Sequence, residues 1–267
     1  MPHTPVLAHD RAGPASHAPL LLVHAGIADR RMWEPLWAGL ARERDVLRID
    51  LRGFGESVAR PDDGWSHVAD VTATLDALGI GRAHLVGASL GAGVAVEVAL
   101  TRPELVASLL LVAPGGALLT RPTDELRAFI DAEVAALERE DIDAAAAANV
   151  DWWVVSPRRE ADAVDPEVRA LVHAMQRRAF ELTADWDEID ETELDPPATD
   201  RLAEIAVPTL VLIGGLDLDA IGEAAAGVVT GVAGARMVTW DDCAHLPSLE
   251  RPDDFGTFVK EWLAPLA

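Results

Sequence analysis

Three residues of this 267-residue chain could do chemistry together: a serine, an aspartate and a histidine. Ser89 lies in the glycine-flanked stretch GASLG (87–91), Asp217 in GGLD, and His245 in DDCAHLPSLERP. A serine hydroxyl is a weak nucleophile unless a base takes its proton, and a histidine base needs an acid that orients it. The combination therefore indicates nucleophilic attack on a carbonyl through a covalent intermediate on serine.

The residues around Ser89 predict a sharp turn. HLVG before it is typical of a strand, and LGAGVAVEVAL after it is typical of a helix. A G-x-S-x-G motif between a strand and a helix holds the serine Oγ above a sheet, and its glycines make room for the neighbouring backbone. The N–H of Leu90, the first residue of the predicted helix, would then point to the place where an oxyanion forms.

The same glycine cluster has a second interpretation. Gly87, Gly91 and Gly93 resemble the phosphate loop of short-chain dehydrogenases, where a helix N-terminus binds a dinucleotide pyrophosphate. That family carries the loop on its first strand, whereas at least two predicted strands precede it here. The chain also contains no tyrosine, so the Tyr-x-x-x-Lys of that family is absent. We therefore favour the nucleophile interpretation and expect no cofactor.

The remaining reactive residues follow predicted strands. His245 is the last histidine of the chain and lies between a predicted strand and the final helix. Asp217 follows the strand VLIGG, with Asp219 as the competing acid; we prefer Asp217 because an acid that must reach the imidazole should leave the strand end promptly. A second oxyanion donor should come from Gly26, in an early loop that His24 is expected to brace.

Apolar runs alternate with helical patterns, which is typical of a mostly parallel sheet covered by helices on both faces. The predicted strands are 20–26, 44–50, 83–87, 106–114, 207–215 and 235–242. The predicted helices are 32–42, 67–80, 90–103, 123–141, 166–186 and 252–266. The stretch 120–203 has no strand pattern, so we predict a helical cap there, inserted into a core domain of 1–119 and 204–267.

Taken together, these motifs resemble the α/β-hydrolase superfamily over nearly the whole chain. The resemblance rests on HAG (24–26) with a tryptophan nine residues after the histidine, DLRGFGES (50–57), GASLG, GGLD (214–217) and AHLPSLERP. It implies an α/β-hydrolase fold with Ser89 as nucleophile, Asp217 as orienting acid and His245 as base. It also assigns the backbone N–H groups of Gly26 and Leu90 to the oxyanion hole. The usual HG of this family is HA here.

The motifs are most similar to those of esterases, enol-lactonases and carbon–carbon bond hydrolases. We expect a serine hydrolase that cleaves a carboxylic ester or lactone of a small, largely apolar substrate through an acyl-enzyme. Three alternatives stay open: carbon–carbon cleavage of a dienoic ketone by the same triad, an accompanying perhydrolase activity, and a ligand-binding protein without catalysis. Serine at the turn disfavours dehalogenases and epoxide hydrolases, which carry aspartate there.

A cap would shape the substrate pocket. The candidate lining residues are Ile27, Trp152, Trp153 and Met175. Tryptophan and methionine in a small helical block also serve as its own core, so each candidate has a packing interpretation as well. The acidic run 185–195 is expected to be solvated and, if it flanks the mouth, to discourage anionic substrates.

Composition narrows the partners. A formal net charge of -23 disfavours nucleic acid and anionic membranes, and the apolar runs are too short to span a bilayer. Cys243 is the only cysteine, so no internal disulfide can form, and we expect it to pack rather than react. No signal-peptide pattern or metal-ligand spacing is present. We expect a cytoplasmic monomer or homodimer that acts on a small molecule without a metal.

Overall fold

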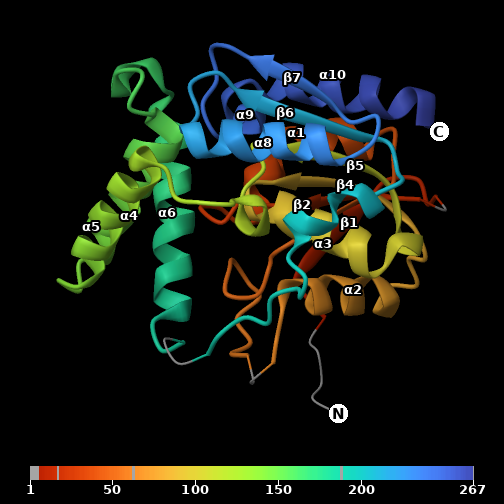
Figure 1. The fold of residues 1–267 in the computed structure, drawn as a ribbon, viewed down its shortest axis with the longest axis horizontal. Helices are drawn as coiled ribbons and strands as arrows, with labels where there is room; N and C mark the ends of the chain where they lie inside the picture. Colours follow the sequence, from red (N-terminus) through yellow and green to blue (C-terminus); the bar gives the residue numbers. More distant parts are fainter. Residues whose placement is uncertain (1–5, 17, 62–63, 187–188, 267) are drawn as a thin grey trace.

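A seven-stranded sheet forms the centre of the computed structural model, which describes residues 6–16, 18–61, 64–186 and 189–266 (Figure 1). The strand order is β1-β3-β2-β4-β5-β6-β7, with β1 antiparallel to β3 and every other pair parallel. The predicted mostly parallel sheet is therefore confirmed. The strands are β1 (His9–Ala12), β2 (Leu20–Val23), β3 (Val46–Ile49), β4 (Ala83–Ala88), β5 (Val106–Val112), β6 (Thr209–Gly214) and β7 (Arg236–Trp240).

Helices cover both faces of the sheet, as predicted. Leu20 and Leu22 of β2 belong to one buried cluster with α1 (Glu34–Ala41) and α10 (Pro252–Leu263). Leu21 and Val23 belong to the other, with the helices α2 (His67–Ala77), α3 (Leu90–Thr101) and α8 (Asp219–Gly231). Because both faces of each central strand are buried, the strand sequences are apolar without alternation. Within the described ranges, no helix is long and apolar enough to cross a membrane.

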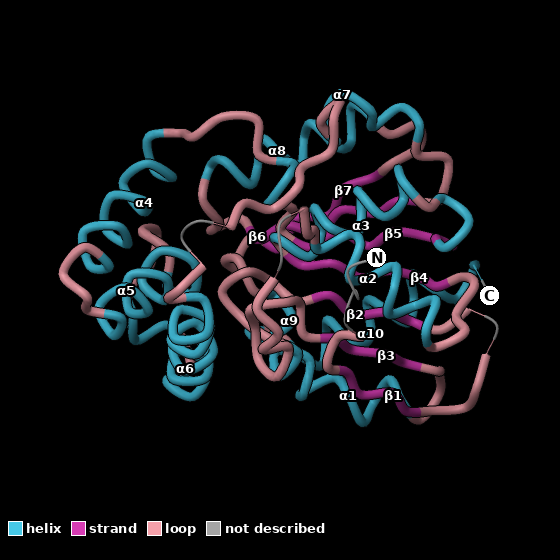
Figure 2. Tube along the Cα trace, turned by 90° about the horizontal axis from the view of Figure 1, so that it is seen from below, coloured by secondary structure: helices cyan, strands magenta, loops and turns pink. Residues whose placement is uncertain are grey.

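Between β5 and β6 the chain forms a helical insertion, which lies to one side of the sheet (Figure 2). It contains α4 (Asp124–Leu137), α5 (Ile142–Asn149), a π-helical segment (Val150–Val155) and α6 (Pro166–Thr183). The side chains of Thr123, Asp141 and Asp165 each cap a helix by accepting a backbone N–H, which explains where α4, α5 and α6 begin. The division into core and cap at 120 and 203 stays a prediction.

The sequence patterns miss several elements. Strand β1 and helix α8 were not expected, nor were the short helices α7 (Ala198–Arg201) and α9 (Pro247–Glu250). Helix α8 contains three glycines, which have low helix propensity, so tertiary packing must stabilise it. The predicted strand 20–26 ends at Val23, because the chain turns there into the loop that carries Gly26.

Gly91, in the first turn of α3, lies directly against the end of β2. A methyl group there would be 2.5 Å from the carbonyl oxygens of both Val23 and His24. We expect Gly91→Ala to lower the free energy of unfolding by about 1–3 kcal/mol, since backbone must shift to admit the methyl. Urea denaturation measures this effect.

Gly227→Ala is the matched control for that substitution. Gly227 lies within α8 and has nothing within 4 Å of an added methyl, so alanine should raise the free energy of unfolding by about 0.5–1 kcal/mol. If Gly91→Ala is as stable as the wild type, the claim that α3 and β2 leave no room for a methyl group at Gly91 is wrong.

Candidate active site

Ser89 occupies a strained turn between β4 and α3. Its φ of 51° and ψ of -114° are rare for an L-residue and cost about 1–3 kcal/mol. Neighbouring backbone holds the turn: Ser89 N–H donates to Val112 O at 2.9 Å, and Ser89 O accepts the N–H of Gly115 at 3.1 Å. A methyl group on Gly87 would lie 2.2 Å from Gly91 O, so the backbone segments before and after Ser89 are in direct contact. The sharp turn predicted from the sequence is present.

A buried acid–imidazole pair lies in the loops after β6 and β7. His245 Nδ1 is 2.8 Å from Asp217 Oδ2, and the two residues are 1% and 8% exposed. The other carboxylate oxygen of Asp217 accepts the N–H of Leu218 at 2.8 Å. Asp219, the competing acid, instead accepts the hydroxyl hydrogen of Thr123. If Nδ1 carries the shared proton, Nε2 is left as the acceptor that a general base requires.

Ser89 Oγ forms no hydrogen bond with His245 or with any other residue of the described ranges. The structure thus joins two members of the expected triad and leaves the third contact open. Contacts of this kind often tighten only when substrate is bound.

The two expected oxyanion donors lie side by side. Leu90 is the first residue of α3, so its N–H has no acceptor within the helix. Gly26 faces it, since a methyl group on Gly26 would lie 3.4 Å from Leu90 Cβ. Gly26, Ser89 and Leu90 are half-buried, whereas Ala25 and Ala88 next to them are fully buried. The surface is therefore open at the place where the three residues meet.

His24 braces the Gly26 loop, as the sequence predicts. Its Nδ1 donates to Ala25 O at 2.8 Å, and its Nε2 accepts the N–H of Leu51 at 2.9 Å. Complete burial lowers the pKa of His24, so the neutral ring keeps one donor and one acceptor for these two bonds. The side chain joins the loops that follow β2 and β3 and has no nitrogen left for chemistry.

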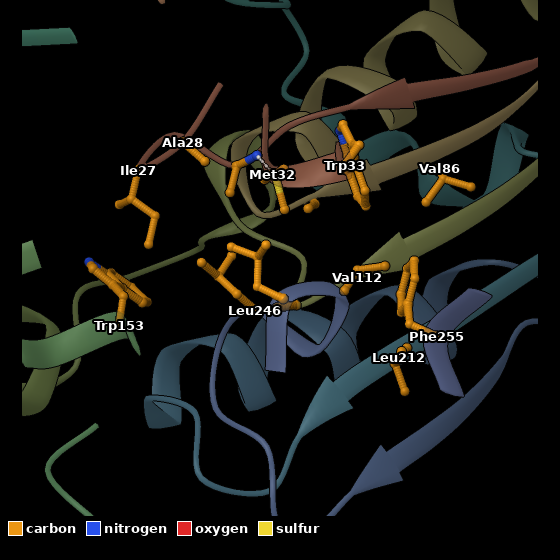
Figure 3. Packing of buried hydrophobic residues seen from close by; sticks show 14 of the residues in the cluster. Ile27, Ala28, Met32, Trp33, Val86, Val112, Trp153, Leu212, Leu246 and Phe255 are labelled. Carbon is orange, nitrogen blue, oxygen red and sulfur yellow. Dashed lines mark hydrogen bonds between the residues drawn. The ribbon is translucent and has the colours of Figure 1, made fainter. Parts of the chain in front are cut away.

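The candidate pocket residues lie at the junction of the insertion and the sheet. The Trp153 ring is centred 4.4 Å from the His245 ring, and Ile27 points toward Trp153 with Leu246 beside them (Figure 3). Trp152 is half-buried against the same core. Met175 is 1% exposed, and its Sδ accepts the N–H of Asp29, so it offers little surface to a substrate here. Lining of the substrate pocket by these residues stays a prediction.

An acidic cavity of about 640 Å³ adjoins the turn that carries Ser89. Leu90 and Gly116 form its wall nearest Ser89, and its acidic side chains are Glu97, Glu191, Glu193 and Asp200. Part of the acidic run therefore flanks a cavity. Asp185, Asp190, Glu193 and Asp195 of the run are exposed, as expected, whereas Glu191 is only 35% exposed and accepts the N–H of His67 at 2.7 Å. Residues 187 and 188 of the run lie outside the described residues.

Cys243, two residues from His245, is buried, and this burial raises the pKa of its thiol to about 12, helped by the charges of Glu250 and Asp242. The thiol is therefore protonated at neutral pH, consistent with packing. In the part of the chain that the structure describes, no three histidine, cysteine or acidic side chains gather as metal ligands.

Two residues near His245 were not found from the sequence. Glu250 accepts the N–H of Ala244 at 2.8 Å and pairs with Arg159 of the insertion at 2.6 Å. Glu250 could have been suspected, because it lies in the AHLPSLERP stretch. Arg159 carries no comparable signal, since nothing in its own segment relates it to a histidine 86 residues away.

Burial raises the pKa of Glu97 to about 7, with a further contribution from the charges of Glu191 and Glu193. The folded chain then binds this proton more tightly than the unfolded chain, whose carboxyl titrates near 4.5. Stability from this group is present below about pH 4.5 and is lost as the pH rises toward 7. We expect Glu97→Gln to raise the melting temperature at pH 8 and to leave it nearly unchanged at pH 4.5.

Calorimetry at several pH values measures this difference. Glu104→Gln is the control, because Glu104 is paired with Arg102, which lowers its pKa, and its substitution should bring no gain at pH 8. An equal gain for Glu97→Gln at both pH values would contradict the raised pKa.

Known proteins share this fold over most of the chain. The chain is 28% identical over 244 residues to the 2-hydroxy-6-oxononadienedioate/2-hydroxy-6-oxononatrienedioate hydrolase of Klebsiella pneumoniae, covering 85% of this chain and 82% of that protein. The enol-lactonase from Burkholderia xenovorans LB400 superposes with a TM-score of 0.76 at 26% identity, covering 96% of each chain. A thermophilic esterase from Thermogutta terrifontis superposes with a TM-score of 0.74 at 27% identity, covering 97% of this chain and 93% of the esterase.

Two matches with over 40% identity are confined to about 100 residues and span only 38% and 27% of the relatives' lengths. The activities of those whole proteins are therefore no guide to the substrate of this one. The model of the alpha/beta hydrolase family, in contrast, matches residues 20–256. The chain belongs to the alpha/beta hydrolase family.

Proposed function

We propose that this protein is a serine hydrolase that cleaves a carboxylic ester or lactone of a small, largely apolar substrate. The observation that carries the proposal is the buried Asp217–His245 pair, in loops at the same carboxyl edge of the parallel sheet as the strained turn of Ser89. Similarity to an enol-lactonase and an esterase, each above 25% identity over nearly the whole chain, supports the same bond class.

The proposed reaction assigns a role to each of these residues, and His245 acts in turn as base and as acid. Ser89 Oγ attacks the carbonyl carbon while His245 Nε2 takes its proton, and Asp217 stabilises the resulting imidazolium. The N–H groups of Gly26 and Leu90 bind the oxyanion. His245 then protonates the alkoxide as the C–O bond breaks, which leaves an acyl-enzyme. Water attacks the acyl carbon, His245 takes a proton from it, and the acid leaves as Ser89 regains its proton.

The charge of the cavity beside Leu90 argues against a dianionic substrate. The carbon–carbon hydrolase of Klebsiella pneumoniae is named for dioates, which carry two carboxylates. The cavity here is lined by four acidic side chains, of which Glu97, with a pKa raised to about 7, is only partly charged at neutral pH, and the whole chain has a formal net charge of -23. A dianion approaching this wall would be repelled, whereas an uncharged ester or lactone would not. We therefore favour uncharged substrates.

Ser89→Ala tests the mechanism. We expect the purified wild type to hydrolyse short p-nitrophenyl esters, and the variant to lose at least about 10³-fold in kcat, because no nucleophile remains. A fluorophosphonate probe should label the wild type at Ser89 and leave the variant unlabelled. Wild-type turnover by Ser89→Ala would refute the assignment, and a labelled protein without turnover on an ester and lactone panel would favour the ligand-binding alternative.

The cavity charge predicts a preference between matched substrates. p-Nitrophenyl acetate should be hydrolysed with a kcat/KM about tenfold above that of mono-p-nitrophenyl succinate at low ionic strength, since only the succinate ester carries a carboxylate. Glu193→Gln and added salt should both narrow the gap. An equal rate for the two esters at low salt would show that the cavity does not face the substrate.

A further inference from the structure

The insertion contacts both loops that carry the acid–imidazole pair. Trp153 O, in the π-helical segment, accepts the N–H of His245 at 3.3 Å. Ser156 Oγ donates to Leu216 O, the residue before Asp217. These two contacts join one short segment of the insertion to the loops after β6 and β7.

Arg159 makes the third contact, and it is an ion pair removed from solvent. The side chains of Arg159 and Glu250 are 13% and 9% exposed, and Arg159 Nη2 lies 2.6 Å from Glu250 Oε2. The same guanidinium donates to the carbonyl oxygens of Val154 at 2.7 Å and Val155 at 2.8 Å. It thereby binds the end of the π-helical segment and the carboxylate together.

Glu250 connects Arg159 to the loop that carries His245, called the histidine loop below. Its second oxygen, Oε1, accepts the N–H of Ala244 at 2.8 Å, and Ala244 directly precedes His245. Arg159 also donates to Asp242 O at 3.3 Å, on the other side of the same loop. Arg159 therefore contacts the histidine loop at two places. It donates directly to the backbone of Asp242, and it pairs with Glu250, which accepts the N–H of Ala244.

The pair also neutralises charge near the base. Burial raises the pKa of Glu250, and the negative charge of Asp217 adds a small contribution in the same direction. Without Arg159, two carboxylates would share this buried region with one counter-charge fewer. Removing one member of a buried, hydrogen-bonded ion pair leaves the other uncompensated, so the loop should rearrange to relieve it.

We propose that Arg159 is a positioning residue that acts on His245 through Glu250, so that the insertion is part of the catalytic unit as well as a cover for the substrate. This inference rests on the proposed function. Arg159 reaches the loop beside the base and not the reacting atoms, so its loss should alter the rate of the chemical step more than substrate binding.

The test compares Arg159→Met with Arg158→Met on p-nitrophenyl acetate. Arg158 is the matched control, because it is the adjacent arginine and pairs with Glu125 of α4 at 2.8 Å. We expect Arg159→Met to lower kcat by about tenfold or more with KM within about threefold, since small displacements of a catalytic group cost this much. Arg158→Met should keep both values, and Arg159→Lys should recover part of the lost kcat.

A double-mutant cycle tests the route through Glu250. Glu250→Gln keeps an oxygen that can accept the N–H of Ala244, so it removes the charge with the least disturbance of the loop. If Arg159 acts through Glu250, Arg159→Met/Glu250→Gln should lose no more kcat than the worse single variant. Additive losses would overturn this route.

Proton NMR provides a readout that a purely structural role would not change. The Nδ1–H shared by His245 and Asp217 should give a low-field resonance in the wild type that is lost in Asp217→Asn and weakened in Arg159→Met. A folded Arg159→Met with the wild-type kcat and resonance would overturn the inference. Failure of the proposed function is distinguishable, because it would appear as undiminished turnover by Ser89→Ala.

Discussion

The close backbone contact between Gly87 and Gly91, on either side of Ser89, is the constraint on which the rest of the site depends. A serine at a φ of 51° can persist only because the chain on either side fixes it, and the fixing contacts leave no room for side chains at Gly87 or Gly91. The helix start at Leu90 follows from the same turn, so one local feature provides both a hydroxyl and an N–H without a helical acceptor at the carboxyl end of β4. The strain is offset by the contact of Gly91 with the end of β2 and by the hydrogen bond between Ser89 O and the N–H of Gly115 in the loop after β5.

Parallel strands then bring the remaining groups to this edge. Gly26 follows β2, Asp217 follows β6 and His245 follows β7, and in a parallel sheet the carboxyl ends of the strands lie at one edge. These residues are up to 219 positions apart in the sequence, yet the topology places each in a loop at the same edge of the sheet as Ser89. The sheet therefore acts as a scaffold, and the chemistry is assigned to the loops.

A site residue could be predicted from the sequence when the residues that position it are its neighbours in the sequence, and could not when they are distant. The turn at Ser89 is specified within five residues, so its motif was sufficient. Asp217 and Asp219 differ by two positions, and only the three-dimensional register shows that one contacts His245 and the other Thr123. Arg159 could not be found, because its position depends on how the insertion packs, and β1 is too short and too polar to stand out as a strand.

The buried Arg159–Glu250 pair also has a consequence for how this chain could be recombined with its relatives. A helical insertion between β5 and β6 is a natural segment to exchange between related proteins, because both of its junctions lie outside the sheet. Here, however, the sheet domain contributes a buried carboxylate whose counter-charge belongs to the insertion. A transplanted insertion without an arginine at this place would leave Glu250 desolvated and unpaired, so a chimaera would inherit a defect in the histidine loop of its host. Domain exchange with this chain should therefore treat the insertion and the segment 242–250 as one unit.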